Sequence, residues 1–413
     1  MMKILVINCH SDNRGDEAAV HAMVDEINIS YPNTIITLSI RGAGTKYPNM
    51  PSNVKMIQQF MPLSFKTKFA HKIAVLTRGR IAISVHEKEL IDEIVQADIV
   101  LHAPGGPSIG DTYYNDEPTY LAIYDLLIAM HKPYMFYAPS MGPFRKEERN
   151  SWRKKILEHS KAIVLRDPIS EQYVRKFLPD KSVVLALDSA FQHDINIAKN
   201  QKKLNQYTAL KVFLERHKKC VGITITDLKW HPVYSKDPTV AENIREVFSK
   251  FLTNIIKLGY GVVFIPQLYG NGNDYDLMRS FCYNSRDYFI VTSTEERYDT
   301  YFQQYLISQL YAVIGMRYHS NIFSAKMGTP FISVSYEQKM KGFMEKLNLE
   351  KFCIDLEKIS EDNLTRLFEQ LVANYNEYKK FLSDKHNFMK NEAHKTTDIL
   401  ETVIKKEKEQ RNE

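Results

Sequence analysis

The chain has 413 residues, of which 44% are hydrophobic and 25% are charged, and its formal net charge is +6. This composition is typical of a globular protein, and the length favours two domains, because single hydrophobic cores stop growing at roughly 250–300 residues. No basic stripe with interleaved aromatic residues occurs, so we do not expect nucleic acid as a partner. The modest positive charge fits an anionic substrate, contact with an anionic membrane surface, or simply a solvated surface.

The cysteines and the apolar stretches indicate the cellular compartment of the protein. Cys9, Cys220, Cys282 and Cys353 are scattered and form no Cys-X-X-Cys or Cys/His cluster. This spacing argues against structural zinc and against a disulfide framework. No uncharged apolar stretch is long enough to cross a bilayer, and the one at the N-terminus is too short for a signal peptide. We therefore expect a cytoplasmic protein, and peripheral contact at the inner face of the cytoplasmic membrane would be consistent with this.

Short apolar runs alternate with helical patterns in the first half of the chain. Runs rich in Val, Ile and Leu that do not alternate with polar residues are typical of strands buried on both faces. Strands separated by helices indicate βαβ units in a parallel sheet. The runs that contain the predicted strands are KILVINC (3–9), TIITLSI (34–40), DIVLHAPGG (98–106), PYMFYAPSMG (133–142), AIVLRD (162–167) and SVVLALD (182–188).

The same pattern restarts after a polar stretch, 194–218, which we interpret as a linker with some helix. The second set of predicted strands is CVGITIT (220–226), GVVFIPQ (261–267), YFIVT (288–292), YAVIGMR (311–317), PFISVSY (330–336) and FCID (352–355). Residues 366–413 form a charged helical pattern, which we interpret as a solvated, partly frayed tail. The predicted fold class is α/β, with two Rossmann-like domains, 1–193 and 219–365, that face a cleft, and a C-terminal helical tail.

Residues that follow the strands are the candidates for function, because ligands of open α/β sheets bind beyond the carboxyl ends of the strands. After the first strand, Asn13 and Asp16 can cap a helix or face a ligand, and capping is at least as well supported by the spacing. The glycines of 104–110, Gly106 among them, permit either a sharp turn or a close approach to a ligand. Neither GxGxxG nor GxxxxGK[ST] occurs, so the sequence supports no dinucleotide or P-loop site.

The block YAVIGMRYHSNIFSAKMGTPFISVSYEQKMKGF (311–343) carries three basic side chains at the ends of two predicted strands. Arg317, His319 and Ser320 begin a predicted helix that Gly328 closes, and a helix N-terminus favours an anion. Lys339 follows the next strand and can reach the same anion. A single His or Lys is more often structural, but the convergence of the three basic residues predicts an anion site that performs proton chemistry.

Six motifs together resemble the polysaccharide pyruvyl transferase family. They are NRGDEA (13–18), PGG (104–106), YAPSMGPF (137–144), LRDPIS (165–170), LDSAF (187–191) and GMRYHSNIFSAKMGTPFISVSYEQKMKGFMEKLNL (315–349). The resemblance implies a GT-B-like fold and a transfer from phosphoenolpyruvate to two hydroxyls of one sugar, in a cell-surface polysaccharide or its lipid-linked precursor. The product would be a cyclic pyruvate ketal, phosphate would leave, and neither a metal nor another cofactor is implied.

The resemblance also assigns roles to residues of the matching motifs. Arg166, Arg317 and Lys339 would bind the phosphate and carboxylate of phosphoenolpyruvate, together with Tyr318 and Ser320 of the same turn. His319 would supply or relay protons, and Arg317 would stabilise the departing phosphate together with the lysine and the helix N-terminus.

The first domain would then hold the sugar acceptor, with Asn13, Asp16 and Gly106 as candidate contacts. Trp230 and His231, from the sequence DLKWHP, are weaker candidates, because a tryptophan is more often simply packed than stacked on a sugar.

Two departures from the family pattern leave alternatives open. Tyr318 stands where the family often has leucine, and Glu337-Gln338 stands where Asp-Pro is common. A GT-B glycosyltransferase with a nucleotide-sugar donor could use Glu337 or Gln338 to bind ribose or base. A non-enzymatic module that binds an anionic sugar or phosphate would bind without releasing phosphate.

Overall fold

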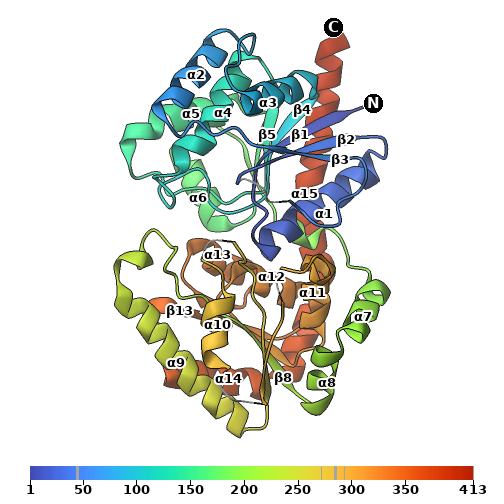
Figure 1. Cartoon of the computed structure of the whole chain (residues 1–413), viewed down its shortest axis with the longest axis vertical. Coiled ribbons are helices and arrows are strands. Elements are labelled where there is room, and N and C mark those ends of the chain that lie inside the picture. The colour runs from blue at the N-terminus through green and yellow to red at the C-terminus, as the bar shows by residue number, and fades with distance from the viewer. Residues whose placement is uncertain (43–45, 271, 283–285, 293, 413) are drawn as a thin grey trace. The chain divides into compact units, whose positions relative to one another are not determined.

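The computed structural model describes residues 1–42, 46–270, 272–282, 286–292 and 294–412 (Figure 1). The chain divides into two compact units that do not follow the order of the sequence. Unit 1 contains Met1–Ser11, Ala19–His193 and Lys390–Glu413, and unit 2 contains Asp12–Ala18 and Asp194–Met389. Each unit is built on its own parallel sheet with alternating helices, so the predicted α/β class with two Rossmann-like domains is confirmed.

The sheet of unit 1 has the order β3-β2-β1-β4-β5-β6-β7, and every neighbouring pair of these strands is parallel. The predicted strands of this half are confirmed, and β3 is an additional strand that we did not predict. It lies at the edge of the sheet, where most of its side chains stay half-buried, and so it lacks a continuous apolar run. The strands are β1 (Lys3–Cys9), β2 (Ile35–Ile40), β3 (Val54–Gln58), β4 (Ile99–His102), β5 (Tyr134–Tyr137), β6 (Ala162–Leu165) and β7 (Val183–Leu185).

Successive side chains of β1 enter different core clusters, as expected for a strand buried on both faces. Leu5 and Ile7 pack in a cluster with residues of α2 to α6, whereas Ile4 and Val6 pack with residues of α1 and α15. The helices are α1 (Arg14–Ser30), α2 (Phe65–Leu76), α3 (Val85–Gln96), α4 (Glu117–Ala129), α5 (Asn150–His159), α6 (Pro168–Phe177) and α15 (Tyr375–Asn412).

The C-terminal helix α15 corrects one prediction. We expected a solvated and partly frayed tail, but Leu400, Val403 and Ile404 are buried in the same cluster as Ile4 of β1. The Thr397 hydroxyl also lies 2.7 Å from the Tyr137 hydroxyl. The second half of α15 is therefore a packed helix of unit 1, because its narrow apolar stripe at i, i+3 and i+4 is enough to bury one face.

The sheet of unit 2 has the order β10-β9-β8-β11-β12-β13 and is also parallel. Its strands, all predicted, are β8 (Cys220–Thr224), β9 (Gly261–Phe264), β10 (Tyr288–Ile290), β11 (Ala312–Gly315), β12 (Phe331–Ser335) and β13 (Cys353–Asp355). Its helices are α7 (Ile197–Gln206), α8 (Thr208–Arg216), α9 (Pro238–Lys257), α10 (Tyr275–Phe281), α11 (Thr300–Ser308), α12 (Tyr318–Met327), α13 (Gln338–Leu347), α14 (Glu361–Ala373) and the first part of α15.

The segment 194–218, which we expected to be a linker, belongs to unit 2. It consists mainly of α7 and α8, and their side chains Leu204, Leu210 and Phe213 are buried. The polar residues of these helices lie on their exposed sides, and this is why the stretch looked like a linker in the sequence.

Candidate functional site

The predicted basic residues of unit 2 lie beyond the carboxyl ends of neighbouring strands. Arg317 follows β11 and Lys339 follows β12, while His231 follows β8 and Asp274 follows β9. These four strands are adjacent in the order β9-β8-β11-β12. Side chains that are far apart in the sequence therefore come from the edge of the sheet where ligands of this architecture bind.

Arg317 is held by a buried carboxylate. Its Nε lies 3.2 and 3.1 Å from the two carboxylate oxygens of Asp274, and its Nη2 donates to the same carboxylate. Asp274 also accepts backbone hydrogen bonds of 3.0 Å from Gln267 and Leu268. Burial acts to lower the pKa of Arg317, but Asp274 outweighs it, with help from Tyr336, and raises the pKa above its usual value. The guanidinium is thus permanently charged and fixed in orientation.

The turn between β11 and α12 is held by hydroxyl groups. Arg317 occupies the N-cap of α12, and its backbone N–H donates to Thr224 Oγ1 at 3.4 Å. The Thr224 and Ser320 hydroxyls lie 2.7 Å apart, and the Ser320 hydroxyl donates to the Arg317 carbonyl at 2.6 Å. Ser320, which we expected to contact the donor, is fully buried and holds the turn.

Lys339 also has an acidic partner. Its Nζ lies 2.5 Å from Glu337, and His231 Nε2 lies 3.3 Å from the other oxygen of the same carboxylate. Burial acts to raise the pKa of Glu337, but Lys339 and His231 outweigh it and hold this pKa well below its usual range. Lys339 Nζ lies 5.8 Å from the centre of the Tyr318 ring. Arg317 and Lys339 are therefore each balanced by a carboxylate.

His319 lies in the first turn of α12 and packs directly on Gly15. A Cβ built on Gly15 would lie 2.0 Å from His319 Nδ1 and 2.5 Å from its Cβ, far inside any carbon contact. Only glycine fits there without a shift of the imidazole. The motif NRGDEA thus contributes to the position of His319, a contact between residues about 300 positions apart that the sequence did not reveal.

The rest of NRGDEA packs within unit 2, to which the first residues of α1 belong. The Asn13 side chain accepts the Gly15 N–H at 2.7 Å, so the capping alternative for Asn13 holds. Arg14 and Glu17 form a buried ion pair of 2.5 Å, and Glu17 accepts the Thr300 N–H at 2.9 Å. Asp16 is half-buried, and the structure shows no hydrogen bond to its carboxylate within the described ranges.

Arg166 belongs to unit 1, whereas the other predicted basic residues belong to unit 2. It is 1% exposed, and it donates to Asp188 at 2.6 Å and to Ser140 at 2.9 Å. This cluster joins the motifs YAPSMGPF, LRDPIS and LDSAF inside unit 1. The geometry shows a buried structural ion pair at the position where we predicted a contact to the donor.

The loop that contains Gly106 is tightly packed. The Ser140 N–H donates to the Gly105 carbonyl at 3.1 Å, and Gly110 has a positive φ of 136°. A Cβ on Gly110 would lie 2.6 Å from Gly142 Cα. Two glycine-containing loops therefore approach closely here, which explains Gly110 and the glycine of the MGP sequence without a ligand. Gly106 itself is partly exposed.

A polar cluster in unit 1 was missed by the sequence analysis. His10 follows β1 and Arg41 follows β2, at the carboxyl edge of the sheet. The Arg41 guanidinium lies 3.5 Å above the Tyr120 ring and donates to Thr119 Oγ1 at 2.6 Å, and the Tyr120 hydroxyl lies 2.8 Å from His10 Nε2. The signal was available, because His10 and Arg41 each directly follow a predicted strand.

Arg41 differs from the other buried or half-buried arginines in its charge balance. Within the described residues no carboxylate lies at ion-pair distance from Arg41, and burial lowers its pKa from the ordinary value. The five other buried or half-buried arginines of the described residues each contact a carboxylate: Arg14, Arg149, Arg153, Arg166 and Arg317. A partly desolvated cation with no carboxylate in contact is suited to a polar or anionic ligand.

His102 is a buried neighbour of this cluster. Its Nδ1 lies 2.5 Å from the Tyr124 hydroxyl and 3.1 Å from Asn8 Nδ2, and its Nε2 lies 2.8 Å from the Ser108 hydroxyl. Burial, together with the nearby His10 and Arg41, lowers the pKa of His102 to about 3. The ring is therefore neutral near pH 7 and serves as a fixed hydrogen-bonding group.

Comparison with known proteins identifies the family. A model of the family described as polysaccharide pyruvyl transferase matches residues 13–338, a span that includes Asn13, Arg166, Arg317 and His319 and ends one residue before Lys339. The chain belongs to this family. The chain is also similar to the amylovoran biosynthesis protein AmsJ of Erwinia amylovora, with 21% identity over 446 aligned residues that cover 97% of this chain and 100% of AmsJ.

Solved structures of other proteins share the fold of this chain. It is similar to the UDP-GlcNAc 2-epimerase of Neisseria meningitidis bound to UDP-GlcNAc, with a TM-score of 0.58 and 12% identity over 97% of this chain and 100% of that chain. It is also similar to a ugt transferase of Siraitia grosvenorii in complex with UDP, with a TM-score of 0.56 and 8% identity over 98% and 100%. At this identity the likeness concerns the fold alone, and it is the predicted GT-B-like class.

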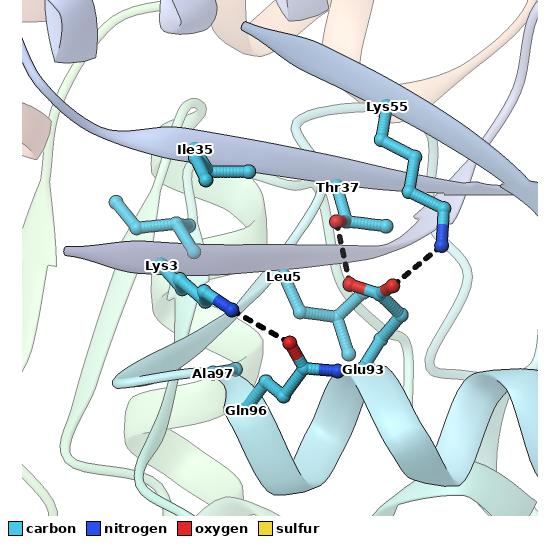
Figure 2. A pocket seen from close by; sticks show the side chains of 9 residues that line it. Lys3, Leu5, Ile35, Thr37, Lys55, Glu93, Gln96 and Ala97 are labelled. Atoms are coloured by element: carbon cyan, nitrogen blue, oxygen red, sulfur yellow. Dashed lines mark hydrogen bonds and ion pairs between the residues drawn. The ribbon is translucent and has the colours of Figure 1, made fainter. Parts of the chain in front are cut away.

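One pocket of the protein lies away from all of the candidate residues. It has a volume of about 170 Å³ and is lined by the first residues of β1 and β2 together with β3 and α3. Figure 2 shows that its polar side chains bond to one another: Lys3 to Gln96 at 2.6 Å, and Glu93 to Thr37 at 2.7 Å and to Lys55 at 2.6 Å. Because it opens at the amino ends of the strands, we assign it no substrate.

Two further features are absent from the part of the chain that the structure describes. No group of three or more His, Cys, Asp or Glu side chains there is placed to hold a metal ion. No helix of that part of the chain is both long enough and apolar enough to cross a membrane.

Proposed function

We propose that this protein transfers the pyruvyl group of phosphoenolpyruvate to two hydroxyls of one sugar in a polysaccharide or its precursor, forming a pyruvate ketal and releasing phosphate. Membership of the polysaccharide pyruvyl transferase family supports the class of reaction. The observation that carries the proposal is the turn at the carboxyl end of β11, where Arg317 caps α12 and His319 lies in its first turn.

Arg317 and the N-terminus of α12 provide the anion site in this proposal. Asp274 binds the Nε and Nη2 groups of the guanidinium, and in the proposed complex the Nη1 group donates to a phosphate or carboxylate oxygen of the donor. Lys339, positioned by Glu337, supplies a second cation. The two carboxylates hold the cations in place before the donor binds, and such preorganisation is what transition-state stabilisation requires.

The reaction balances with one proton donor. A proton adds to the methylene carbon of phosphoenolpyruvate, and the first sugar hydroxyl bonds to the adjacent carbon and loses its proton. The second hydroxyl then bonds to the same carbon and displaces the phosphate. The bond between that carbon and the phosphate oxygen breaks, and the proton of the second hydroxyl leaves with the phosphate. His319 delivers the proton to the methylene carbon and takes one back from a hydroxyl. Arg317 and Lys339 stabilise the departing phosphate.

The acceptor sugar binds in unit 1 in this proposal. His10, Arg41 and Tyr120 offer hydrogen-bonding groups and an aromatic ring at the carboxyl edge of that sheet. Of the contacts predicted from the sequence, Gly106 stays a candidate in unit 1, whereas Asn13 and Asp16 belong to unit 2 and the Asn13 side chain is engaged as a helix cap.

The decisive experiment follows phosphate release and product mass when the full chain is incubated with phosphoenolpyruvate and a panel of lipid-linked or aryl glycosides. We expect a product heavier by one pyruvate ketal. His319→Ala and His319→Gln should lose about 10²–10⁴-fold in turnover, as for removal of a general acid. His159→Gln, which changes an exposed histidine of α5, is the matched control.

Two outcomes would contradict the proposal. Tight binding of a nucleotide sugar without binding of phosphoenolpyruvate would favour a glycosyltransferase, although the Glu337 carboxylate that could serve its ribose is already engaged by Lys339 and His231. Near-wild-type turnover of both His319 variants would remove the acid role.

For the acceptor, Arg41→Met should raise the KM for the sugar while leaving the affinity for phosphoenolpyruvate unchanged.

A further inference from the structure

Segment 63–85 of unit 1 exposes an unusual number of large apolar side chains. It contains α2 and the residues on both sides of it. The exposed side chains, 51–85% accessible, are Leu63, Phe65, Phe69, Leu76, Ile81, Ile83 and Val85. Isolated exposed apolar residues are normal, but a run of this kind within one short segment marks an interaction site.

Helix α2 has its apolar face toward solvent. Its inner face is buried through Ala70, His71 and Ala74, and the His71 ring is fixed by Glu87 at 3.2 Å and by the Ala122 carbonyl at 2.9 Å. A capping box between Ser64 and Thr67 closes its N-terminus. The helix is thus firmly built, and its small and polar residues face the protein while its phenylalanines face outward. A surface helix of a globular protein normally shows the reverse pattern.

The same surface is strongly and uniformly basic. Residues 27–86 contain no Asp or Glu at all, although the whole chain has 49 of them. Segment 63–85 carries five exposed cations: Lys66, Lys68, Lys72, Arg78 and Arg80. On α2, Phe65, Lys68, Phe69, Lys72 and Leu76 follow the spacing i, i+3, i+4, i+7 and i+11, so apolar and basic side chains share one face.

We propose that this face of segment 63–85 docks on the surface of an anionic lipid bilayer. The aromatic and aliphatic side chains would enter the boundary between headgroups and acyl chains, and the lysines and arginines would lie among the lipid phosphates. A second copy of the chain is a poorer occupant, because a two-fold interface would place the five cations of one copy against those of the other. The charge therefore favours a polyanionic surface over self-association.

Vesicle sedimentation of the full chain tests the proposal without any substrate, and so independently of the proposed reaction. Binding should be strong to vesicles that contain phosphatidylglycerol, weak to phosphatidylcholine alone, and reduced by high salt. Each lysine near an anionic surface contributes about fivefold, so Lys66→Gln/Lys68→Gln/Lys72→Gln should lower the partition coefficient by about 100-fold. Phe65→Ser/Phe69→Ser should lower it by about tenfold or more.

The control variant is Lys199→Gln/Lys202→Gln/Lys218→Gln, which removes the same charge from exposed positions of unit 2. It should retain binding, and all variants should keep the wild-type melting temperature because the replaced side chains are exposed. Equal binding to both kinds of vesicle, or an equal loss in the control, would overturn the proposal. So would a dimer that Phe65→Ser/Phe69→Ser dissociates while the wild type ignores vesicles, since the face would then join two copies.

Discussion

Gly15→Ala tests how the site is assembled, because the three atoms nearest to the added methyl group all belong to His319. The new Cβ would lie 2.0 Å from His319 Nδ1 and 2.5 Å from its Cβ. Carbon contacts relax near 3.5–4.0 Å, so the imidazole must move by about 1.5 Å or α1 must retreat. Retreat is opposed by the hydrogen bond from the Thr300 N–H to Glu17 at 2.9 Å and by the one from the Arg14 N–H to the Gln267 carbonyl at 2.9 Å.

The expected effects on stability and on turnover differ in size. Overpacking destabilises by about 1–3 kcal/mol, and the higher helix propensity of Ala offsets about 1 kcal/mol of this. The net loss in the free energy of unfolding should therefore be about 0–2 kcal/mol. A catalytic group displaced by about 1 Å can lose about 10²-fold in rate, so turnover should fall much further than stability.

The assays are phosphate release from phosphoenolpyruvate and denaturant unfolding in a double-mutant cycle with His319→Gly, which removes the three nearest clashing atoms. In that background Gly15→Ala should become stabilising by up to about 1 kcal/mol. Ile29→Ala, at an exposed position of the same helix, is the control and should leave turnover unchanged. Near-wild-type turnover of Gly15→Ala, together with additive free energies in the cycle, would refute the reasoning.

Three further predictions concern buried groups. Asp274→Asn leaves the buried Arg317 without its counter-charge and should cost about 3–5 kcal/mol in denaturant unfolding, with weaker binding of phosphoenolpyruvate in a titration. Burial holds the pKa of His102 at about 3 against an ordinary value of 6.5, so below pH 6.5 the unfolded chain binds a proton that the folded chain does not. Stability should fall by about 1.4 kcal/mol per pH unit from that group, and His102→Gln should remove this slope from unfolding measured against pH. Leu400→Ala should lose about 2–5 kcal/mol in thermal or denaturant unfolding, whereas a solvated tail would change by less than about 0.5 kcal/mol.

Much of the fold was predictable, because strands buried on both faces have sequences that are continuous apolar runs. The edge strand β3 and the packing of the second half of α15 were not predicted, for the opposite reason. Each buries only part of its surface, and the charged residues around Leu400 outnumber the apolar ones. The stripe Leu400, Val403 and Ile404 was nevertheless visible at helical spacing. The sequence therefore indicated that α15 packs on a hydrophobic core, but it did not indicate which of the two cores.

The candidate site was predictable only where it is local. The turn that holds Arg317 and His319 follows directly from a strand, a helix start and Gly328, which has the left-handed conformation expected of a helix C-terminus. The partners of these residues are not local: Asp274 comes from the end of another strand, and Gly15 comes from the other end of the chain. No spacing in the sequence indicates such contacts, because they depend on the order of strands in the sheet.

The division of the chain has a consequence for biosynthesis. The core of unit 1 contains Leu400, Val403 and Ile404, so it cannot close until the ribosome has made all of unit 2. A nascent chain that has emerged as far as residue 193 presents the sheet of unit 1 with one face still uncovered where α15 will pack. During most of its synthesis the protein therefore exposes an apolar surface of the kind that chaperones bind, and a fragment cut at this boundary would retain that exposure permanently.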